Sequence, residues 1–445
     1  MTEALGAGTG IHRSQWRVII LSSLGGALEF YDFVIYSMFA QYIGAAFFPA
    51  ADPLNSLLLS FSVFAVGYVA RPVGGVVFSH FGDKYGRRRV FIVAMLTMSL
   101  ATTAIGLLPT YAQWGIGASI CMVLLRLLQG FSLGGELPGA ITYVAESADP
   151  RRVGFAAGFI FFCVNTGVAL ASGLNLAVHQ LLAEPAIAAW GWRIGFLFGG
   201  VCGFVSFWLR LSLEETREFQ QMKNVASKQP FGELMKSHPA NVVAGVAALT
   251  ATAGFNGLLF AMPALLPRIM GYTPAAASEA QYIALIVISL GMLVTAWLGD
   301  RFPRRYILGA GALLLLVLAI PFFSAAAERS VNLNLLFVMA GVVASLVNGT
   351  MAGVVADLFP TRIRFSGVAV SFNLAFSIFS GIAPLAAVEL VKLLGSPTGP
   401  AYYMCLCGGI TFVGSLFLRR YEGHVGHALQ AANDGAAQPS SVPAP

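Results

Sequence analysis

Two acids, Glu29 and Asp32, interrupt an otherwise apolar and aromatic stretch, ALEFYDFVIY at residues 27–36. An ionised aspartate at the centre of a membrane span costs roughly 2.5 to 3.5 kcal/mol. Such a residue is tolerated where it has a cationic partner, a water-filled cavity or a bound proton. Helical spacing puts both acids on one face with Tyr36, and we expect that face to point into a cavity rather than at lipid.

A cationic partner is available in the segment LLRLLQGFSLGGEL, which carries Arg126. Asp32 and Arg126 each lie about ten residues below the same surface of the membrane, although their spans run in opposite directions. A rise of ~1.5 Å per residue therefore places them at similar depth. The sequence therefore predicts an Asp32–Arg126 ion pair. Burial favours the neutral acid and a neighbouring arginine favours the carboxylate, so the proton affinity of such a pair depends on local hydration and on the position of the arginine.

The composition identifies the environment of these residues. Only 10% of the 445 residues are charged and the mean hydropathy is +0.76, which excludes an ordinary soluble domain. Twelve apolar runs are each near or above the ~20 residues that cross a bilayer. We expect an all-α polytopic membrane protein with spans at 17–43, 55–80, 89–109, 115–145, 153–181, 192–211, 240–268, 277–299, 306–326, 332–357, 364–393 and 400–419.

The chain divides into two similar halves. GDKYGRR at 82–88 and GDRFPRR at 299–305 follow the second and eighth spans, and AESADPRRVG and ADLFPTRIRFSG follow the fourth and tenth. This repeat predicts two six-helix bundles with a substrate site between them. The domains are a first bundle at 1–210, a cytoplasmic linker at 211–238, a second bundle at 239–420 and a disordered cytoplasmic tail at 421–445.

The repeated loops suggest a cytoplasmic latch between the halves. Glycines allow sharp turns, and acids can accept hydrogen bonds from the backbone N–H groups at helix N-termini. Arginines can donate two hydrogen bonds to one carboxylate. The alternative is that these are ordinary loop charges. The predicted latch comprises Gly82, Asp83, Gly86, Arg87, Arg88, Glu146, Arg152, Asp300, Arg304, Arg305, Asp357, Arg362 and Arg364.

The net charge of +6 follows from topology rather than from nucleic-acid binding. Most lysines and arginines fall in segments that lie on one side of a twelve-span bundle, and the positive-inside rule then places both termini in the cytoplasm. The N-terminus does not have the pattern of a secretory signal. The five cysteines all fall inside predicted spans without CxxC or nearby histidine, so we expect no metal site and no disulfide framework.

Several stretches resemble the major facilitator superfamily and, within it, the metabolite:proton symporter family. They are GGALEFYDFVIY, RPVGGVVFSHFGDKYGRRR, RLLQGFSLGGELPGA, WGWRIGF, LEETREF and ADLFPTRIRFSGVAVSFNLAFSIFSGIAP. The resemblance implies a proton-coupled symporter that works by alternating access, with the span-four arginine and a span-one acid involved in coupling. Asp32, Arg126 and Glu29 are the candidates; Glu29 is the competing proton site. A permanent structural tie and direct substrate contact are the alternatives for the Asp32–Arg126 pair.

Other inward polar or aromatic residues are candidates for substrate contact. They are Tyr36, Gln129, Glu136, Arg193, Asn165, Asn256, Asn348 and Asn373. The alternatives are an interhelical hydrogen bond for the asparagines, an interfacial helix anchor for Arg193, and helix packing for Tyr36 and Glu136.

The expected function is import of a small mono-, di- or tricarboxylate with protons across a bacterial inner membrane. One alternative is symport of a zwitterionic osmolyte such as proline or betaine, which would favour a carboxylate and aromatic rings around a quaternary nitrogen. Another is a non-transporting nutrient receptor on the same fold. We expect no enzymatic activity, because no metal or nucleophile constellation is present, and ATP is not the expected energy source, because no Walker motif is present. The expected partners are the substrate, protons and lipid, with no cofactor and no nucleic acid, in a monomer.

Overall fold

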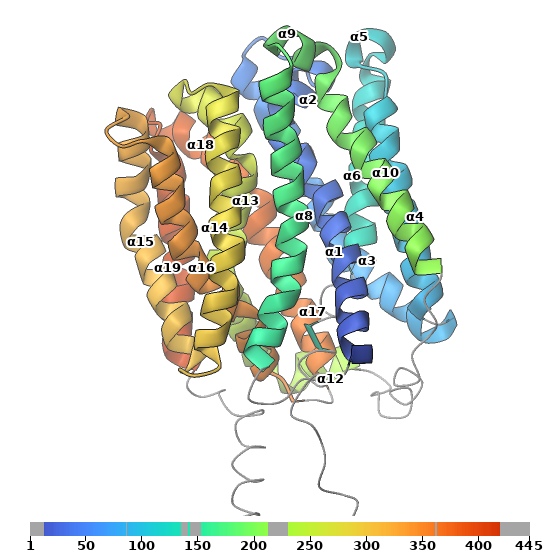
Figure 1. Cartoon of the computed structure of the whole chain (residues 1–445), viewed down its shortest axis with the longest axis vertical. Coiled ribbons are helices and arrows are strands. Elements are labelled where there is room, and N and C mark those ends of the chain that lie inside the picture. The colour runs from blue at the N-terminus through green and yellow to red at the C-terminus, as the bar shows by residue number, and fades with distance from the viewer. Residues whose placement is uncertain are drawn as a thin grey trace, which may run out of the picture.

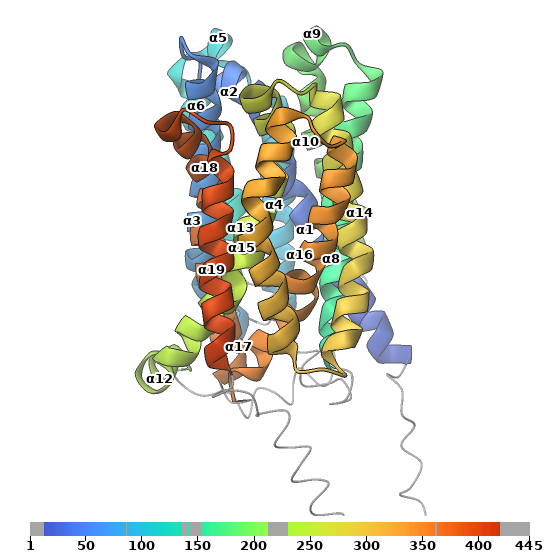
Figure 2. The same cartoon turned by 90° about the vertical axis from the view of Figure 1, so that its left-hand side faces the viewer.

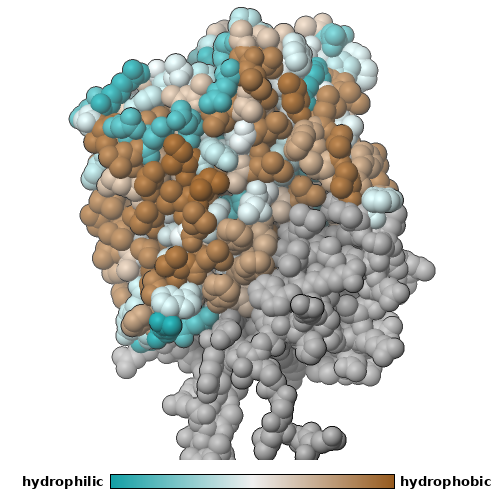
Figure 3. All heavy atoms as spheres, in the orientation of Figure 1, coloured by the Kyte–Doolittle hydropathy of each residue, from teal (hydrophilic) through white to brown (hydrophobic). Residues whose placement is uncertain are grey.

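The computed structural model describes residues 13–85, 87–134, 141–142, 153–211, 230–360 and 363–418, and its regular elements there are all helical. Ten of the described helices are long and apolar enough to cross a membrane. Apolar side chains cover the flank seen in Figure 3, whereas hydrophilic residues gather at the top of that view. The chain is therefore a multi-pass membrane protein, as the composition predicts.

The helices coincide with the expected spans. In the first half they are α1 (Arg13–Met38), α2 (Ala40–Phe47), α3 (Pro53–Tyr85), α4 (Arg87–Leu107), α5 (Tyr111–Trp114), α6 (Ile116–Leu133), α8 (Val153–Leu181), α9 (Glu184–Ala186), η1 (Ile187–Gly191) and α10 (Trp192–Leu211). The first span is formed by α1 and α2, which are separated by a break at Phe39. Of the expected fourth span, 115–145, α6 covers the first part and ends at Leu133, whereas residues 135–140 and 143–145 lie outside the described part of the chain.

The second half repeats this arrangement after the short helix α12 (Pro230–Ser237). Its helices are α13 (Pro239–Met270), α14 (Pro274–Gly299), α15 (Arg304–Glu328), α16 (Leu333–Asp357), α17 (Arg364–Ala375), η3 (Phe376–Ser380), α18 (Gly381–Leu394) and α19 (Gly399–Phe417). The eleventh span contains the π-helical turn η3, which widens the helix and displaces its side chains locally. The two halves stand side by side in Figure 1, and Figure 2 shows the second half in front of the first. We call the end with α12 the linker end and the opposite end, with α5 and α9, the distal end.

The halves contact each other along two antiparallel helix pairs. On α8 and α14, Asn165 Nδ2 donates to Ser289 Oγ at 2.6 Å, and Ser172 Oγ donates to Gln281 Oε1 at 2.9 Å. Closer to the distal end, Asn175 Nδ2 donates to Ser278 Oγ at 2.7 Å. The residue numbers of successive pairs rise along α8 and fall along α14, so the two helices are antiparallel. The contact between them extends through the depth of the bundle.

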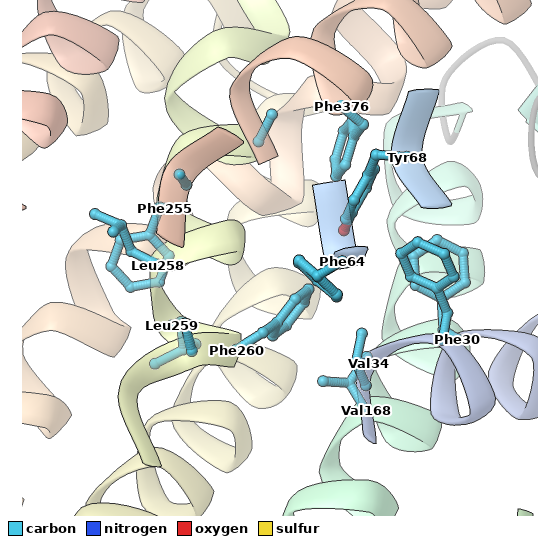
Figure 4. Close-up of a cluster of buried hydrophobic side chains, with 14 of the residues drawn as sticks. Phe30, Val34, Phe64, Tyr68, Val168, Phe255, Leu258, Leu259, Phe260 and Phe376 are labelled. Atoms are coloured by element: carbon cyan, nitrogen blue, oxygen red, sulfur yellow. The ribbon is translucent and has the colours of Figure 1, made fainter. Parts of the chain in front are cut away.

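The second pair joins α3 to the eleventh span. Ser377 Oγ donates to the Tyr68 carbonyl at 2.7 Å, and Ser380 Oγ donates to Tyr68 Oη at 2.9 Å. At the distal end Lys392 Nζ donates to Asn55 Oδ1 at 2.6 Å. Between the halves, Figure 4 shows Tyr68 beside Phe376 and a cluster of apolar side chains from both halves. The halves are therefore in contact at both ends in this conformation.

Glycines allow α3 and α6 to approach closely. A Cβ on Gly130 would collide with the carbonyl oxygen of Gly67, and one on Gly74 would collide with that of Phe131. A Cβ on Gly134 would meet the backbone of Arg71. This contact holds the arginines of the two helices, Arg71 and Arg126, in the interior of the first half.

We predict that Gly130→Val destabilises the protein because the new side chain must separate α3 from α6. Overpacking of this kind costs about 1–3 kcal/mol or more. The thermal unfolding midpoint of the purified protein should fall relative to wild type. Gly117→Val on the same helix is the matched control, since a Cβ there meets nothing within 4 Å. Equal midpoints for the two variants would contradict the close approach.

Candidate functional site

Arg126 lies on α6 with a side chain that is 0% exposed. Its Nη1 donates to Gln129 Oε1 at 2.8 Å and to the Phe33 carbonyl at 3.3 Å. The guanidinium carbon lies 4.5 Å from the ring centroid of Phe33 and 4.4 Å from that of Tyr36. Nε and Nη2 have no hydrogen-bond partner among the described residues. Ring faces, the Gln129 amide oxygen and the Phe33 carbonyl stabilise the cation in part, while donors remain available for a further acceptor.

The predicted direct ion pair between Asp32 and Arg126 is wrong for this conformation. The described residues contain no such pair, and Asp32 Oδ1 has no hydrogen-bond partner. Asp32 instead faces α4 and α10: the Thr102 hydroxyl is its hydrogen-bonding neighbour, and a Cβ on Gly199 would collide with Oδ1. Similar depth was correctly inferred, but depth alone does not specify the direction in which a helical side chain points.

Two side chains connect Asp32 to Arg126 indirectly. Gln129 accepts from Arg126 through Oε1 and donates through Nε2 to Thr102 Oγ1 at 2.8 Å. The Thr102 hydroxyl lies 3.0 Å from the Met98 carbonyl and also neighbours Asp32. It carries one hydrogen, which it can donate to only one of these acceptors at a time. The state of Asp32 can therefore be communicated to Arg126 through Thr102 and Gln129.

Arg71 on α3 is a second buried cation, which the sequence analysis did not select. It is 1% exposed, and its Nε and Nη1 have no hydrogen-bond partner. The rings of Tyr68, Phe30 and Phe33 lie 5.3, 5.7 and 5.9 Å from its guanidinium carbon. The available signal was an arginine followed by proline inside the apolar run 55–80. Phe33 contacts both arginines, so their charges share one aromatic ring.

Glu29 belongs to the surroundings of Arg71. It is 5% exposed and acts electrostatically on that guanidinium. Glu29 and Asp32 therefore face different groups, although both are buried on α1. The two acids predicted to occupy one polar face are each close to a different part of the site: Glu29 to Arg71, and Asp32 to Thr102.

The remaining predicted contact residues have hydrogen bonds within the helix packing. Tyr36 Oη donates to the Ser60 carbonyl at 3.3 Å while its ring covers Arg126. Asn256 Nδ2 donates to Asn348 Oδ1 at 3.0 Å inside the second half. Asn165 and Asn373 bond across the halves, and Asn373 Nδ2 reaches the Gly134 carbonyl at 3.0 Å.

Arg193 and Glu136 complete the predicted set. Arg193 Nη1 donates to the carbonyls of Gly106 and Leu108 at 2.8 Å each, so it caps the end of α4. This geometry matches the alternative of a helix anchor. Glu136 lies outside the described residues.

At the linker end, Asp300 joins the two halves. Its Oδ1 and Oδ2 accept from the backbone N–H groups of Gly154 and Phe155 at 2.8 Å each, at the start of α8. A carboxylate at a helix N-terminus accepts from free backbone donors and interacts favourably with the helix dipole. Gly154 has no side chain to obstruct this contact; a Cβ there would collide with Asp300.

Arg304 holds Asp300 in place. Its Nη2 lies 2.9 Å from Asp300 Oδ1 and its Nη1 lies 2.6 Å from Asp357 Oδ2. Arg364 Nε donates to the carbonyls of Ala356 and Phe359 at 3.2 Å each, and Arg305 Nη2 donates to Tyr306 Oη at 2.9 Å. The second-half part of the expected latch is therefore an ion-paired cluster whose aspartate caps a helix of the first half.

The first-half part of the expected latch is not described at the level of side chains. Gly82 and Asp83 fall at the end of α3, and Arg87 and Arg88 at the start of α4. Gly86, Glu146, Arg152 and Arg362 lie outside the described residues.

The fold and its site define a two-bundle, twelve-span membrane protein with buried charges near the contact between the halves. The family model of the Major Facilitator Superfamily matches residues 22–384 and 244–441. The chain belongs to this superfamily, which confirms the resemblance and the fold class inferred from the sequence.

Relatives and solved structures agree with this assignment. The chain is 33% identical over 420 residues to the glycine betaine/proline/ectoine/pipecolic acid transporter OusA of Dickeya dadantii, covering 91% of this chain and 83% of the relative. It is 33% identical to the citrate-proton symporter of Klebsiella pneumoniae, covering 88% and 89%. The proton:xylose symporter XylE has the same fold, with a TM-score of 0.73 at 16% identity over 93% of this chain and 97% of XylE.

We predict that Asp300→Ala frees the start of α8. Loss of a helix cap costs about 1 kcal/mol, so amide hydrogen exchange at Gly154 and Phe155 should accelerate by roughly five- to tenfold. Hydrogen exchange of the purified protein, read by mass spectrometry, measures this directly. Asp52→Ala is the matched control, because Asp52 accepts from the Leu54 N–H at the distal end. Unchanged exchange at the start of α8 in Asp300→Ala would refute the cross-half cap.

Proposed function

We propose that this chain is a proton-coupled secondary transporter that imports a small organic acid by alternating access. The observation that carries the proposal is the pair of buried guanidiniums, Arg71 and Arg126, with donors that no group of the described residues accepts. Arg126 is linked through Gln129 and Thr102 to the buried acid Asp32. An anion and a proton together suit this arrangement better than either alone.

Charge balance couples the binding of the anion to the protonation of Asp32. A carboxylate can accept from the free Nε and Nη2 of Arg126, and Arg71 lies beside the same Phe33 ring with free donors of its own. If Asp32 stays ionised, the incoming anion adds a negative charge to a dry interior, where repulsion is strong. Protonation of Asp32 removes that repulsion, so substrate and proton bind together and leave together.

Thr102 and Gln129 transmit the protonation state. An ionised Asp32 accepts the Thr102 hydroxyl hydrogen; a protonated Asp32 leaves that hydrogen for the Met98 carbonyl 3.0 Å away. Gln129 donates to the same hydroxyl oxygen and accepts from Arg126. The strength of the Arg126–Gln129 hydrogen bond therefore changes with the orientation of the Thr102 hydroxyl. The loaded carrier then releases its contacts at the linker end and keeps those at the distal end.

The surroundings of the arginines favour an acid over a zwitterionic osmolyte. Quaternary ammonium recognition uses free aromatic faces. Here the rings of Phe33 and Tyr36 face Arg126, and the rings of Tyr68 and Phe30 face Arg71. OusA is named as a carrier of betaine and proline and the Klebsiella relative as a carrier of citrate, so both classes belong in the test.

The proposal includes the orientation of the chain in the membrane, its oligomeric state and its coupling ion. The linker end, with both chain termini, lies in the cytoplasm of a bacterium, and the distal end faces outside. The chain works as a monomer without a cofactor and is a carrier rather than an enzyme. Protons are its coupling ion.

The test measures proton entry into proteoliposomes under an inward pH gradient, with succinate, citrate or glycine betaine added in separate runs. We expect internal acidification with succinate or citrate. Asp32→Asn should abolish this acidification while exchange of the labelled acid continues, because the neutral side chain mimics a permanently bound proton. Asp52→Asn, at an exposed acid of the distal end, should behave as wild type.

Other outcomes are decisive as well. Acidification with glycine betaine alone would support the zwitterion alternative over the organic acid. Uptake of acid without proton movement would remove Asp32 from coupling. Binding without any movement across the membrane would favour a receptor.

A further inference from the structure

Three titratable side chains form a hydrogen-bonded chain at the distal end. Tyr42 on α2 lies between His179, near the end of α8, and Glu184, at the start of α9. Tyr42 Oη is 2.7 Å from Glu184 Oε1 and 2.9 Å from His179 Nε2. The other ring nitrogen, Nδ1, is 2.8 Å from the Asn175 carbonyl oxygen.

The three contacts require three hydrogens. Each contact brings two nitrogen or oxygen atoms to hydrogen-bonding distance, and this is favourable only when a hydrogen lies between the two atoms. A neutral imidazole supplies one hydrogen and the Tyr42 hydroxyl supplies another, whereas an ionised Glu184 supplies none. With neutral His179 and ionised Glu184, one contact lacks a hydrogen. The observed geometry is therefore complete only when the chain holds one additional proton.

We propose that Tyr42, His179 and Glu184 form a proton-binding site and that His179 carries the proton as an imidazolium in this conformation. Nδ1–H then donates to the Asn175 carbonyl, Nε2–H donates to Tyr42 Oη, and the Tyr42 hydroxyl donates to Glu184. The proton goes to the ring because a free imidazole (pKa about 6.5) is a stronger base than a free glutamate (about 4.3). Glu184 is also exposed, so water stabilises its carboxylate.

The neighbouring groups act in both directions. Burial, the largest effect on His179, disfavours the cation, whereas the Asn175 carbonyl and the charge of Glu184 favour it. The charge of Arg268, which α13 presents to Tyr42, also opposes the cation. The other facing groups are uncharged: Phe39, at the break between α1 and α2, stacks on the imidazole with ring centroids 6.0 Å apart, and α14 contributes Ser278.

This site is connected to the contact between the halves. Asn175, whose carbonyl accepts from His179, also donates through Nδ2 to Ser278 Oγ on α14 of the second half at 2.7 Å. Removal of the proton takes away the donor from Nε2 to Tyr42 and breaks the chain beside this contact. A proton bound here thus stabilises the closed distal end. The proton would come from the side that we propose is outside, separately from the one on Asp32.

The test is ¹⁵N NMR of the full-length protein in liposomes at about pH 7, where an exposed histidine is mostly neutral. The chain has 6 histidines, and the His179 signal is the one that His179→Gln removes. We expect a doubly protonated ring in wild type. Glu184→Gln should give a singly protonated ring, because an amide N–H can donate to Tyr42, which then donates to Nε2. Tyr42→Phe should do the same by removing the acceptor of Nε2–H.

Glu279→Gln is the matched control and should leave the ring doubly protonated, since Glu279 accepts from Asn334 Nδ2 at the same end without touching the chain. A singly protonated His179 in wild type would overturn the proposal. So would a doubly protonated ring in both Glu184→Gln and Tyr42→Phe. The measurement needs neither substrate nor transport, so its result is independent of the proposed organic-acid function.

Discussion

A buried arginine whose donors lack protein acceptors is the constraint from which the rest of this site follows. Moving a charge out of water carries a desolvation cost of several kcal/mol, which a protein normally offsets with a carboxylate and full hydrogen bonding. Arg126 and Arg71 receive aromatic faces instead; Asp32 turns toward Thr102, and Glu29 lies in the surroundings of Arg71. Such an interior is stable enough to persist and still favours the arrival of an anion.

The helix packing keeps this incomplete charge arrangement in place. The glycines of α3 and α6 bring two arginine-bearing helices into backbone contact, and α1 supplies Phe33 between the arginines. The polar contacts between the halves are small pairs and single capping interactions, such as Asp300 on α8, and they accompany an apolar cluster from both halves (Figure 4). Each of these polar contacts is weak enough to break during a conformational change. The fold therefore separates a rigid charged site from contacts that can be exchanged.

The spans and the two-half organisation could be predicted because they depend on composition and on repeated motifs. The apolar runs reproduce the helices closely, and the matching loops correctly indicated two bundles. The Asp32–Arg126 pair could not be predicted, because a residue's depth does not give its rotation about the helix axis. Asp32 turns toward Thr102 and Gly199, which lie far away in the sequence.

Two further features needed the three-dimensional structure. Arg71 lies inside an apolar run, and the proline that follows it is the only feature of the sequence that marks it. The role of Asp300 as a cap of α8 depends on backbone N–H groups, which have no sequence signature beyond a permissive glycine at 154. The tyrosine–histidine–glutamate chain joins Tyr42 to residues that lie 137 and 142 positions further along the sequence, and nothing in this spacing indicates contact.

Linkage between anion binding and protonation of Asp32 is the central claim, and proton uptake on binding measures it most directly. Titration calorimetry of the purified protein with citrate or succinate, in buffers of different ionisation enthalpy, gives the number of protons taken up for each anion bound. The account predicts about one net proton in wild type and none in Asp32→Asn, which should still bind the anion. Equal proton uptake by both proteins, or anion binding by wild type without any uptake, would contradict it.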